Sequence, residues 1–119
     1  MHELTGVPLS SLTTLRLGGT AAQLVEVVKP EDLVEAIRTA DAAGEPVLVL
    51  GGGSNLVVAD AGFAGTVIKI ATTGVHVAAS TDLVAITAQA GEDWDDLVRT
   101  AVAEGWSGIE TMSGIPGLV

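Results

Sequence analysis

Three consecutive glycines followed by a serine and an asparagine are the residues best suited to ligand chemistry. This glycine run, residues 51–55, directly follows the apolar stretch 47–50. Glycines lack a Cβ and let a ligand approach the backbone closely, and converging N–H groups form a concavity that binds anions. Ser54 and Asn55 add a hydroxyl and an amide that bond phosphate oxygens. The run therefore predicts a diphosphate site, with an ordinary glycine-rich turn as the competing interpretation.

The glycine run matches neither of two common nucleotide-binding motifs. A P-loop needs a lysine after its last glycine, and the dinucleotide fingerprint would need glycine in place of Leu56. The whole chain has 15 acidic and 5 basic residues and a formal charge of -10. Such a surface repels nucleic acids and anionic membranes at long range, so we expect small-molecule partners held locally. The basic residues available are Arg16, Lys29, Arg38, Lys69 and Arg99.

Two further segments are candidates for ligand contacts. Residues 13–19 combine two threonines, Arg16 and two glycines, although an isolated arginine more often forms a surface salt bridge. The Ile-Pro loop, residues 113–117, places an apolar Ile-Pro step between two glycines, which makes its backbone stiff. Such a loop could set backbone amides and Ile115 against a flat ring, or be an ordinary turn. Glu110, just before it, is either an orienting residue or merely exposed.

Several functions are disfavoured by composition. The chain has no cysteine, which excludes thiolate nucleophiles and cysteine metal sites. Its 3% aromatic content leaves little to stack nucleic-acid bases. The first residues do not resemble a signal peptide and the apolar runs are too short to span a bilayer, so we expect a cytoplasmic protein. The apolar Leu118 and Val119, just after a turn, lead us to expect that the natural chain continues.

The glycine run is expected to be positioned by a parallel sheet. Residues 24–28 predict a strand, and Pro30 predicts the start of a helix that ends near Gly44. Residues 47–50 are apolar at every position, which is typical of a strand buried on both faces. Together they predict a right-handed βαβ unit, and ligands of such sheets bind beyond the carboxyl ends of the strands.

The second half of the sequence predicts antiparallel structure and one helix. We expect a strand at 66–70 and a hairpin from strands 75–79 and 83–89. Residues 93–104 predict a helix with Asp93 as its N-cap and one apolar stripe. Trp94 lies on that stripe and is expected in the core, and the helix acids are expected to form a solvated face (Asp93, Asp95, Asp96 and Glu104). The fold class is therefore α+β, a parallel part followed by an antiparallel part.

The three candidate clusters, in this order and spacing, resemble the bacterial UDP-N-acetylenolpyruvoylglucosamine reductases, also called UDP-N-acetylmuramate dehydrogenases. Further matching segments occur at residues 65–68, 90–94 and 108–112, and the resemblance covers residues 12–119. It implies the FAD-binding fold of the vanillyl-alcohol oxidase group, in which a parallel and an antiparallel subdomain hold FAD between them. It also implies a division into residues 1–19 as an N-terminal segment, 20–71 as the first subdomain and 72–119 as the start of the second.

The resemblance also implies site residues and a reaction. NADPH would reduce FAD, which would reduce the enolpyruvyl group of a UDP-sugar to give UDP-N-acetylmuramate, a peptidoglycan precursor. The family's catalytic residues and substrate domain would lie beyond Val119, so we expect no reductase activity from these residues alone. Two alternatives stay open: another flavin oxidoreductase of the same fold, and a non-catalytic acidic module. Arg16 and Glu110 are additional candidates, and the implied FAD-binding residues are Leu50, Gly51, Gly52, Gly53, Ser54, Asn55, Leu56, Ser113, Gly114, Ile115, Pro116 and Gly117.

Overall fold

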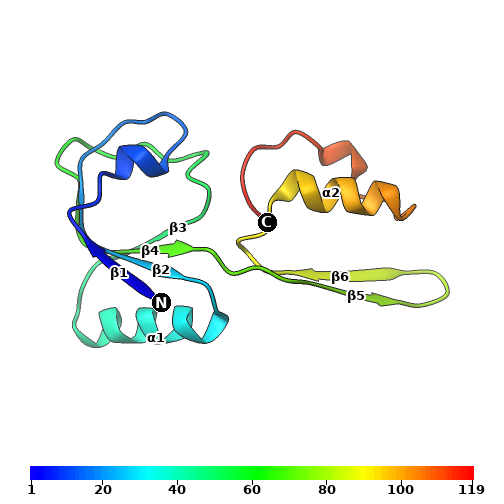
Figure 1. Ribbon diagram of the computed structural model, residues 1–119, viewed down its shortest axis with the longest axis horizontal. Coiled ribbons are helices and arrows are strands. Elements are labelled where there is room, and N and C mark those ends of the chain that lie inside the picture. Colours follow the sequence, from blue (N-terminus) through cyan, green and yellow to red (C-terminus); the bar gives the residue numbers. More distant parts are fainter.

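The computed structural model describes residues 1–119 and shows two lobes, joined where β4 leads into β5 (Figure 1). The first lobe, residues 1–71, holds a four-stranded sheet in the order β1-β2-β4-β3. β2 and β3 both run parallel to β4, whereas β1 runs antiparallel to β2. The elements of this lobe are β1 (His2–Thr5), the 3-10 helix η1 (Leu9–Leu12), β2 (Ala21–Val27), α1 (Pro30–Ala42), β3 (Val47–Leu50) and β4 (Phe63–Ile70).

The sheet of the first lobe carries an apolar cluster on each face. Under α1, the cluster consists of Val25, Val27, Ala36 and Ile68. Because successive strand residues point to opposite faces, neighbouring residues of β2 and β4 contribute to a second cluster on the other face, together with residues of η1 and β3. That cluster contains Leu9, Ala21, Leu24, Leu50 and Val67. The N-terminal segment is thus integrated into the first lobe, through Leu9 and the pairing of β1 with β2.

α1 confirms the predicted helix and its boundaries. Pro30 lies in the first turn together with Glu31 and Asp32, where acidic side chains stabilise the positive end of the helix dipole. The helix ends at Ala42, and Gly44 follows with φ +67°, a conformation that glycine adopts without strain. Its buried face is made of alanines, which lets the helix lie close to β2 and β4.

The prediction that residues 47–50 form a strand is confirmed, but the prediction of burial on both faces is wrong. β3 lies at the edge of the sheet, and Val47 and Val49 are 36% and 49% exposed. The strand buried on both faces is β4, which lies between β2 and β3 and is buried from Gly65 to Ile68. An apolar run does not show which strand will be its neighbour, since that choice depends on a segment further along the chain.

The second lobe, residues 72–119, confirms the predicted hairpin and helix. Its elements are β5 (Val75–Ala79), β6 (Val84–Ala88), α2 (Trp94–Ala103) and the 3-10 helix η2 (Glu110–Met112). The Asp93 carboxylate caps α2 by accepting the Asp96 N–H at 2.9 Å. The expectation that Trp94 lies in the core is wrong: it is only half-buried, and its indole Nε1 donates to the Met112 carbonyl at 2.8 Å. No helix in either lobe is both long and apolar enough to cross a membrane.

Candidate functional site

The glycine run and the end of the Ile-Pro loop face each other across one cleft of about 390 Å³. The cleft lies beyond the carboxyl end of β3, as predicted for the glycine run. The Ser54 hydroxyl donates to the Pro116 carbonyl at 3.3 Å, although the two residues are 62 positions apart. We call this space the binding cleft, and it is lined by Val49, Leu50, Gly51, Gly52, Gly53, Ser54, Asn55, Leu56, Ile70, Ala90, Pro116, Gly117, Leu118 and Val119.

The backbone of the glycine run has unused hydrogen-bond donors. No N–H group of residues 51–55 donates a hydrogen bond to another part of the chain. Gly53 is nevertheless buried, and buried N–H groups without a partner are rare in folded proteins. The hydroxyl of Thr13, close behind the run, is also buried without a partner. The free N–H groups of the glycine run form a set of donors suited to an anion.

The three glycines have different structural roles. A Cβ added at Gly53 would lie 2.1 Å from the Leu12 carbonyl oxygen, and Gly53 has φ +66°, so the fold itself requires glycine there. A Cβ at Gly52 would meet nothing closer than Leu118 Cγ at 3.5 Å, and at Gly51 nothing closer than Leu118 Cδ1 at 3.9 Å. The fold therefore tolerates a side chain at positions 51 and 52, and glycine there keeps the binding cleft open.

Residues 13–19 pack behind the glycine run. The Thr14 N–H donates to the Gly53 carbonyl at 3.0 Å, and the Gly19 N–H donates to the Ala59 carbonyl at 2.9 Å. Arg16 has φ 54°, the only positive φ outside glycine, and it is exposed. The surface salt bridge considered for Arg16 is not formed, because the three ion pairs of the chain involve other residues. Arg16 does not line the binding cleft.

Lys69 is a basic residue beside the glycine run. It pairs with Leu50 in the β3–β4 register and lines a second hollow, of about 430 Å³, together with Gly51 and Gly52. Its Nζ lies 3.6 Å from the Glu26 carboxylate. From the sequence alone, Lys69 is one of five basic residues and is not among the candidate FAD-binding residues. A lysine within an otherwise apolar strand was the available indication.

The Ile-Pro loop does not present free amides as expected. The N–H groups of Ser113, Gly114 and Ile115 all donate to acceptors within the second lobe. Proline has no N–H, so Gly117 alone keeps a free one. Ser113, Gly114 and Ile115 do not line the binding cleft, whereas Pro116 and Gly117 do. The loop therefore offers the cleft mainly apolar surface, because its polar groups bond elsewhere.

Asp95 accepts one of those N–H bonds and also the Ser113 hydroxyl, so this acid lies at the surface as expected but bonds the loop as well. Its Oδ1 accepts the Gly114 N–H at 2.9 Å and the Ser113 hydroxyl at 2.8 Å. These two bonds hold the pKa of the Asp95 carboxyl below its ordinary value. Glu110 makes a similar local bond: it accepts the Gly108 N–H at 2.5 Å, which lowers the pKa of its carboxyl. Glu110 does not line the binding cleft.

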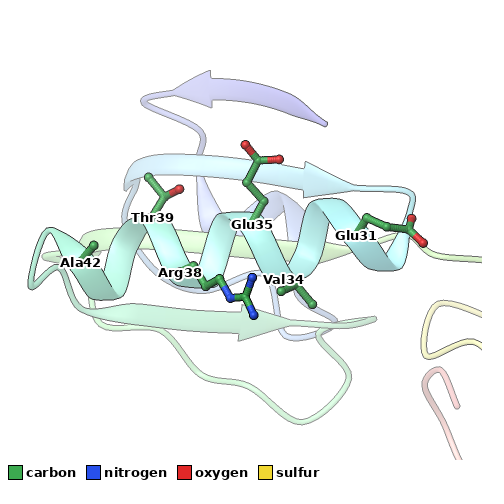
Figure 2. A pocket seen from close by; sticks show the side chains of 6 residues that line it. All are labelled: Glu31, Val34, Glu35, Arg38, Thr39 and Ala42. Atoms are coloured by element: carbon green, nitrogen blue, oxygen red, sulfur yellow. The ribbon is translucent and has the colours of Figure 1, made fainter.

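A separate hollow lies on the outer face of α1, away from the binding cleft. All the side chains that line it come from this one helix (Figure 2). Its charged groups, on Glu31, Glu35 and Arg38, point in different directions and do not converge (Figure 2). A binding site needs polar groups that converge on one ligand, so we regard this hollow as helix surface.

One family of known proteins matches most of the chain. The FAD binding domain family model matches residues 21–119. The chain belongs to the FAD-binding domain family. Its glycine run fits that cofactor, because the free donors of residues 51–55 suit a diphosphate.

Curated relatives of this FAD-binding domain are reductases. The chain is 56% identical over 114 residues to the UDP-N-acetylenolpyruvoylglucosamine reductase of Saccharopolyspora erythraea, covering 95% of this chain and 31% of that protein. It is 49% identical to the same-named protein of Thermobifida fusca, covering 95% of this chain and 32% of that protein. The chain thus spans about a third of the length of the curated relatives that it matches.

A solved structure confirms the predicted fold class. The crystal structure of the UDP-N-acetylenolpyruvylglucosamine reductase of Thermus caldophilus matches with a TM-score of 0.68 and 32% sequence identity. The match covers 99% of this chain and 39% of that one. The α+β class, with its parallel and antiparallel parts, is therefore shared with a known member of the resembled family.

Proposed function

We propose that this chain forms the FAD-binding part of an NADPH-dependent UDP-N-acetylenolpyruvoylglucosamine reductase. The observation that carries the proposal is the row of free N–H groups at residues 51–55, facing Pro116 and Gly117 across the binding cleft. Membership in the FAD-binding domain family and 56% identity to a named reductase support it. Because the chain spans about a third of those relatives, the reaction belongs to the whole protein in this proposal.

The residues of the cleft have distinct proposed roles. The glycine run donates backbone N–H groups to the FAD diphosphate, and Asn55 adds its amide. Leu50 and Leu56 flank the run and enclose the ligand on its apolar side. Lys69 offsets the negative charge of the diphosphate within an acidic protein. When bound, FAD supplies the hydride-transfer chemistry by which NADPH reduces the enolpyruvyl double bond.

The proposed function implies both a metabolic role and a cellular location. The product, UDP-N-acetylmuramate, would enter peptidoglycan precursor synthesis, and with it cell-wall biogenesis, cell shape and cell division. We infer a cytoplasmic location and no direct contact with nucleic acid, in keeping with the charge of -10. Residues 20–71 would be the first FAD-binding subdomain, and residues 72–119 the beginning of the second.

Titration with flavins tests the proposal. We expect the chain to quench FAD fluorescence on binding, and to bind riboflavin much more weakly, because riboflavin lacks the diphosphate. Gly52→Ala should weaken FAD binding by about tenfold or more while leaving the fold intact, since its Cβ would enter the binding cleft without a clash. Equal binding of FAD and riboflavin, or of the wild type and Gly52→Ala, would contradict the diphosphate site.

The alternatives give different results. A non-catalytic acidic module would leave FAD fluorescence and absorbance unchanged, in the whole protein as well as in this chain. Another flavin oxidoreductase of the same fold would bind FAD equally well. In that case the whole protein would not turn over NADPH with UDP-N-acetylglucosamine enolpyruvate, whereas the proposed reductase would. These 119 residues alone should show no NADPH oxidation in that assay.

A further inference from the structure

Asp95 connects α2 to the Ile-Pro loop. Its Oδ1 accepts both the Ser113 hydroxyl and the Gly114 N–H, at 2.8 and 2.9 Å. An ionised carboxylate makes stronger hydrogen bonds than a neutral acceptor, and both bonds end on adjacent residues. One side chain on a helix therefore fixes the start of the loop that reaches the binding cleft.

Packing contributes little to this part of the loop. Residues 113–116 are all exposed, and η2 has no buried residue. A Cβ added at Gly114 would meet nothing within 4 Å. The remaining anchors lie on either side of these two residues. Trp94 Nε1 donates to the Met112 carbonyl at 2.8 Å and the Trp94 N–H to the Gly117 carbonyl at 3.4 Å, while the Val119 N–H donates to the Glu92 carbonyl at 2.9 Å. Between these anchors, Asp95 alone ties residues 113 and 114 to the helix.

The bonds made by Asp95 also determine what the loop offers a ligand. The Ser113 hydroxyl and the Gly114 N–H are turned toward α2 and do not line the binding cleft. Pro116 and Gly117 consequently face the glycine run, where Ser54 bonds the Pro116 carbonyl. A loop released from Asp95 would present its polar groups in other directions, and Pro116 and Gly117 would no longer be held facing the glycine run.

We propose that Asp95 is a positioning residue that holds Ser113 and Gly114 so that Pro116 and Gly117 form the second wall of the FAD site. The inference rests on the proposed function, because the wall matters only if the cleft binds FAD. Asp95 itself does not line the cleft and would act through the loop. Loss of its carboxylate should therefore change both the affinity for FAD and the environment of the bound flavin.

Substitution of Asp95 tests the inference, with Asp96 as the matched control. Asp96 lies on the same helical turn and pairs with Arg99, but its side chain makes no bond to the loop. In Asp95→Ala we expect amide hydrogen exchange at residues 113–115 to rise by about tenfold. FAD binding should weaken by about fivefold, with an altered visible circular dichroism spectrum of the bound flavin. Asp95→Asn should lie between Asp95→Ala and the wild type, because its carbonyl still accepts one bond, and Asp96→Ala should match the wild type.

The outcomes separate the two hypotheses. If neither this chain nor the whole protein binds FAD, the proposed function fails and this inference fails with it. If the wild type binds and Asp95→Ala keeps the same affinity and flavin spectrum, the positioning role is wrong and the FAD site stands. Unchanged amide exchange at residues 113–115 in Asp95→Ala also overturns the positioning role. If far-ultraviolet circular dichroism shows that Asp95→Ala does not fold, the same measurements on Asp95→Asn test the positioning role.

Discussion

The two lobes support the two walls of the binding cleft by different means. In the first lobe, apolar clusters of five and four buried residues lie on the two faces of the sheet. In the second lobe, the buried apolar residues are Val98 and Ala101, and every residue of β5 is exposed. The Cα radius of gyration is 16.6 Å, against about 13 to 14 Å for a compact chain of this length.

This difference explains how each loop is held. Gly53 is fixed by the backbone of Leu12 and Thr13, which is itself packed on the core of the first lobe. The Ile-Pro loop depends instead on hydrogen bonds from α2, chiefly those of Asp95. A wall held by packing is rigid and insensitive to pH, whereas a wall held by a carboxylate depends on its ionisation.

Gly53→Ala should cause the largest loss of stability among the changes that compare the two lobes. The new Cβ would overlap the Leu12 carbonyl in a backbone conformation that alanine adopts with strain. We expect the free energy of unfolding to fall by about 3 kcal/mol or more, measured by urea denaturation. Gly52→Ala, with no positive φ and no overlap, should change it by less than about 1 kcal/mol. Similar losses in both variants would show that position 53 is not packed as described.

A matched pair of valines compares the two lobes directly. Val67 is 0% exposed and Val98 is 2% exposed, but Val67 belongs to a five-residue cluster. Val67→Ala should cost about 2 kcal/mol of stability, because the surrounding sheet cannot collapse into the cavity. Val98→Ala should cost about half as much, and it should accelerate amide exchange in α2 without affecting β2 and β4. An equal cost at both positions would contradict the contrast between the lobes.

Acidification should give the smallest effect and should act on the second wall alone. The pKa values of Asp95 and Glu110 are lowered in the folded chain, from ordinary values of 3.8 and 4.5. A carboxyl with a lowered pKa stabilises the fold above its unfolded-state pKa, and this contribution is lost as the pH falls through the folded-state value. The two carboxylates therefore contribute fully at neutral pH, and their hydrogen bonds weaken only as the pH falls below the ordinary pKa values of these groups.

Amide protection factors between pH 6 and pH 2.5 measure this weakening. The protection of Gly108 and Gly114 should fall with the pH, while that of the β2 and β4 amides stays constant until global unfolding. Loss of protection near pH 6 would contradict the direction of both pKa shifts.

Sequence reasoning predicted the local structure well because the relevant physics is local. Pro30, Gly44 and the Asp93 cap define the two helices through their own backbone preferences. The glycine run was placed correctly at the end of β3, since its position follows from the strand immediately before it. The pairing of the glycine run with Pro116 and Gly117 was anticipated through the family resemblance, not through the residues themselves.

The errors arose where distant segments meet. The position of β4 between β2 and β3, and so the exposure of Val49, depends on a strand that follows β3 in the sequence. An aspartate in the first turn of a helix gives no indication that a loop 18 residues later will bond to it, which is why Asp95 was missed. One of these bonds uses the Gly114 N–H, an amide that the Ile-Pro loop was expected to offer to a ligand.

The outer edge of β3 has a consequence for the behaviour of the chain at high concentration. Val47 and Val49 are exposed on a strand with no pairing partner on its outer side, and such an edge is a template for strand addition by a second molecule. A net charge of -10 keeps two such molecules apart when the ionic strength is low. Salt at about 0.15 M screens that repulsion beyond about 8 Å, so the colloidal stability of the chain is governed by the ionic medium as much as by its fold.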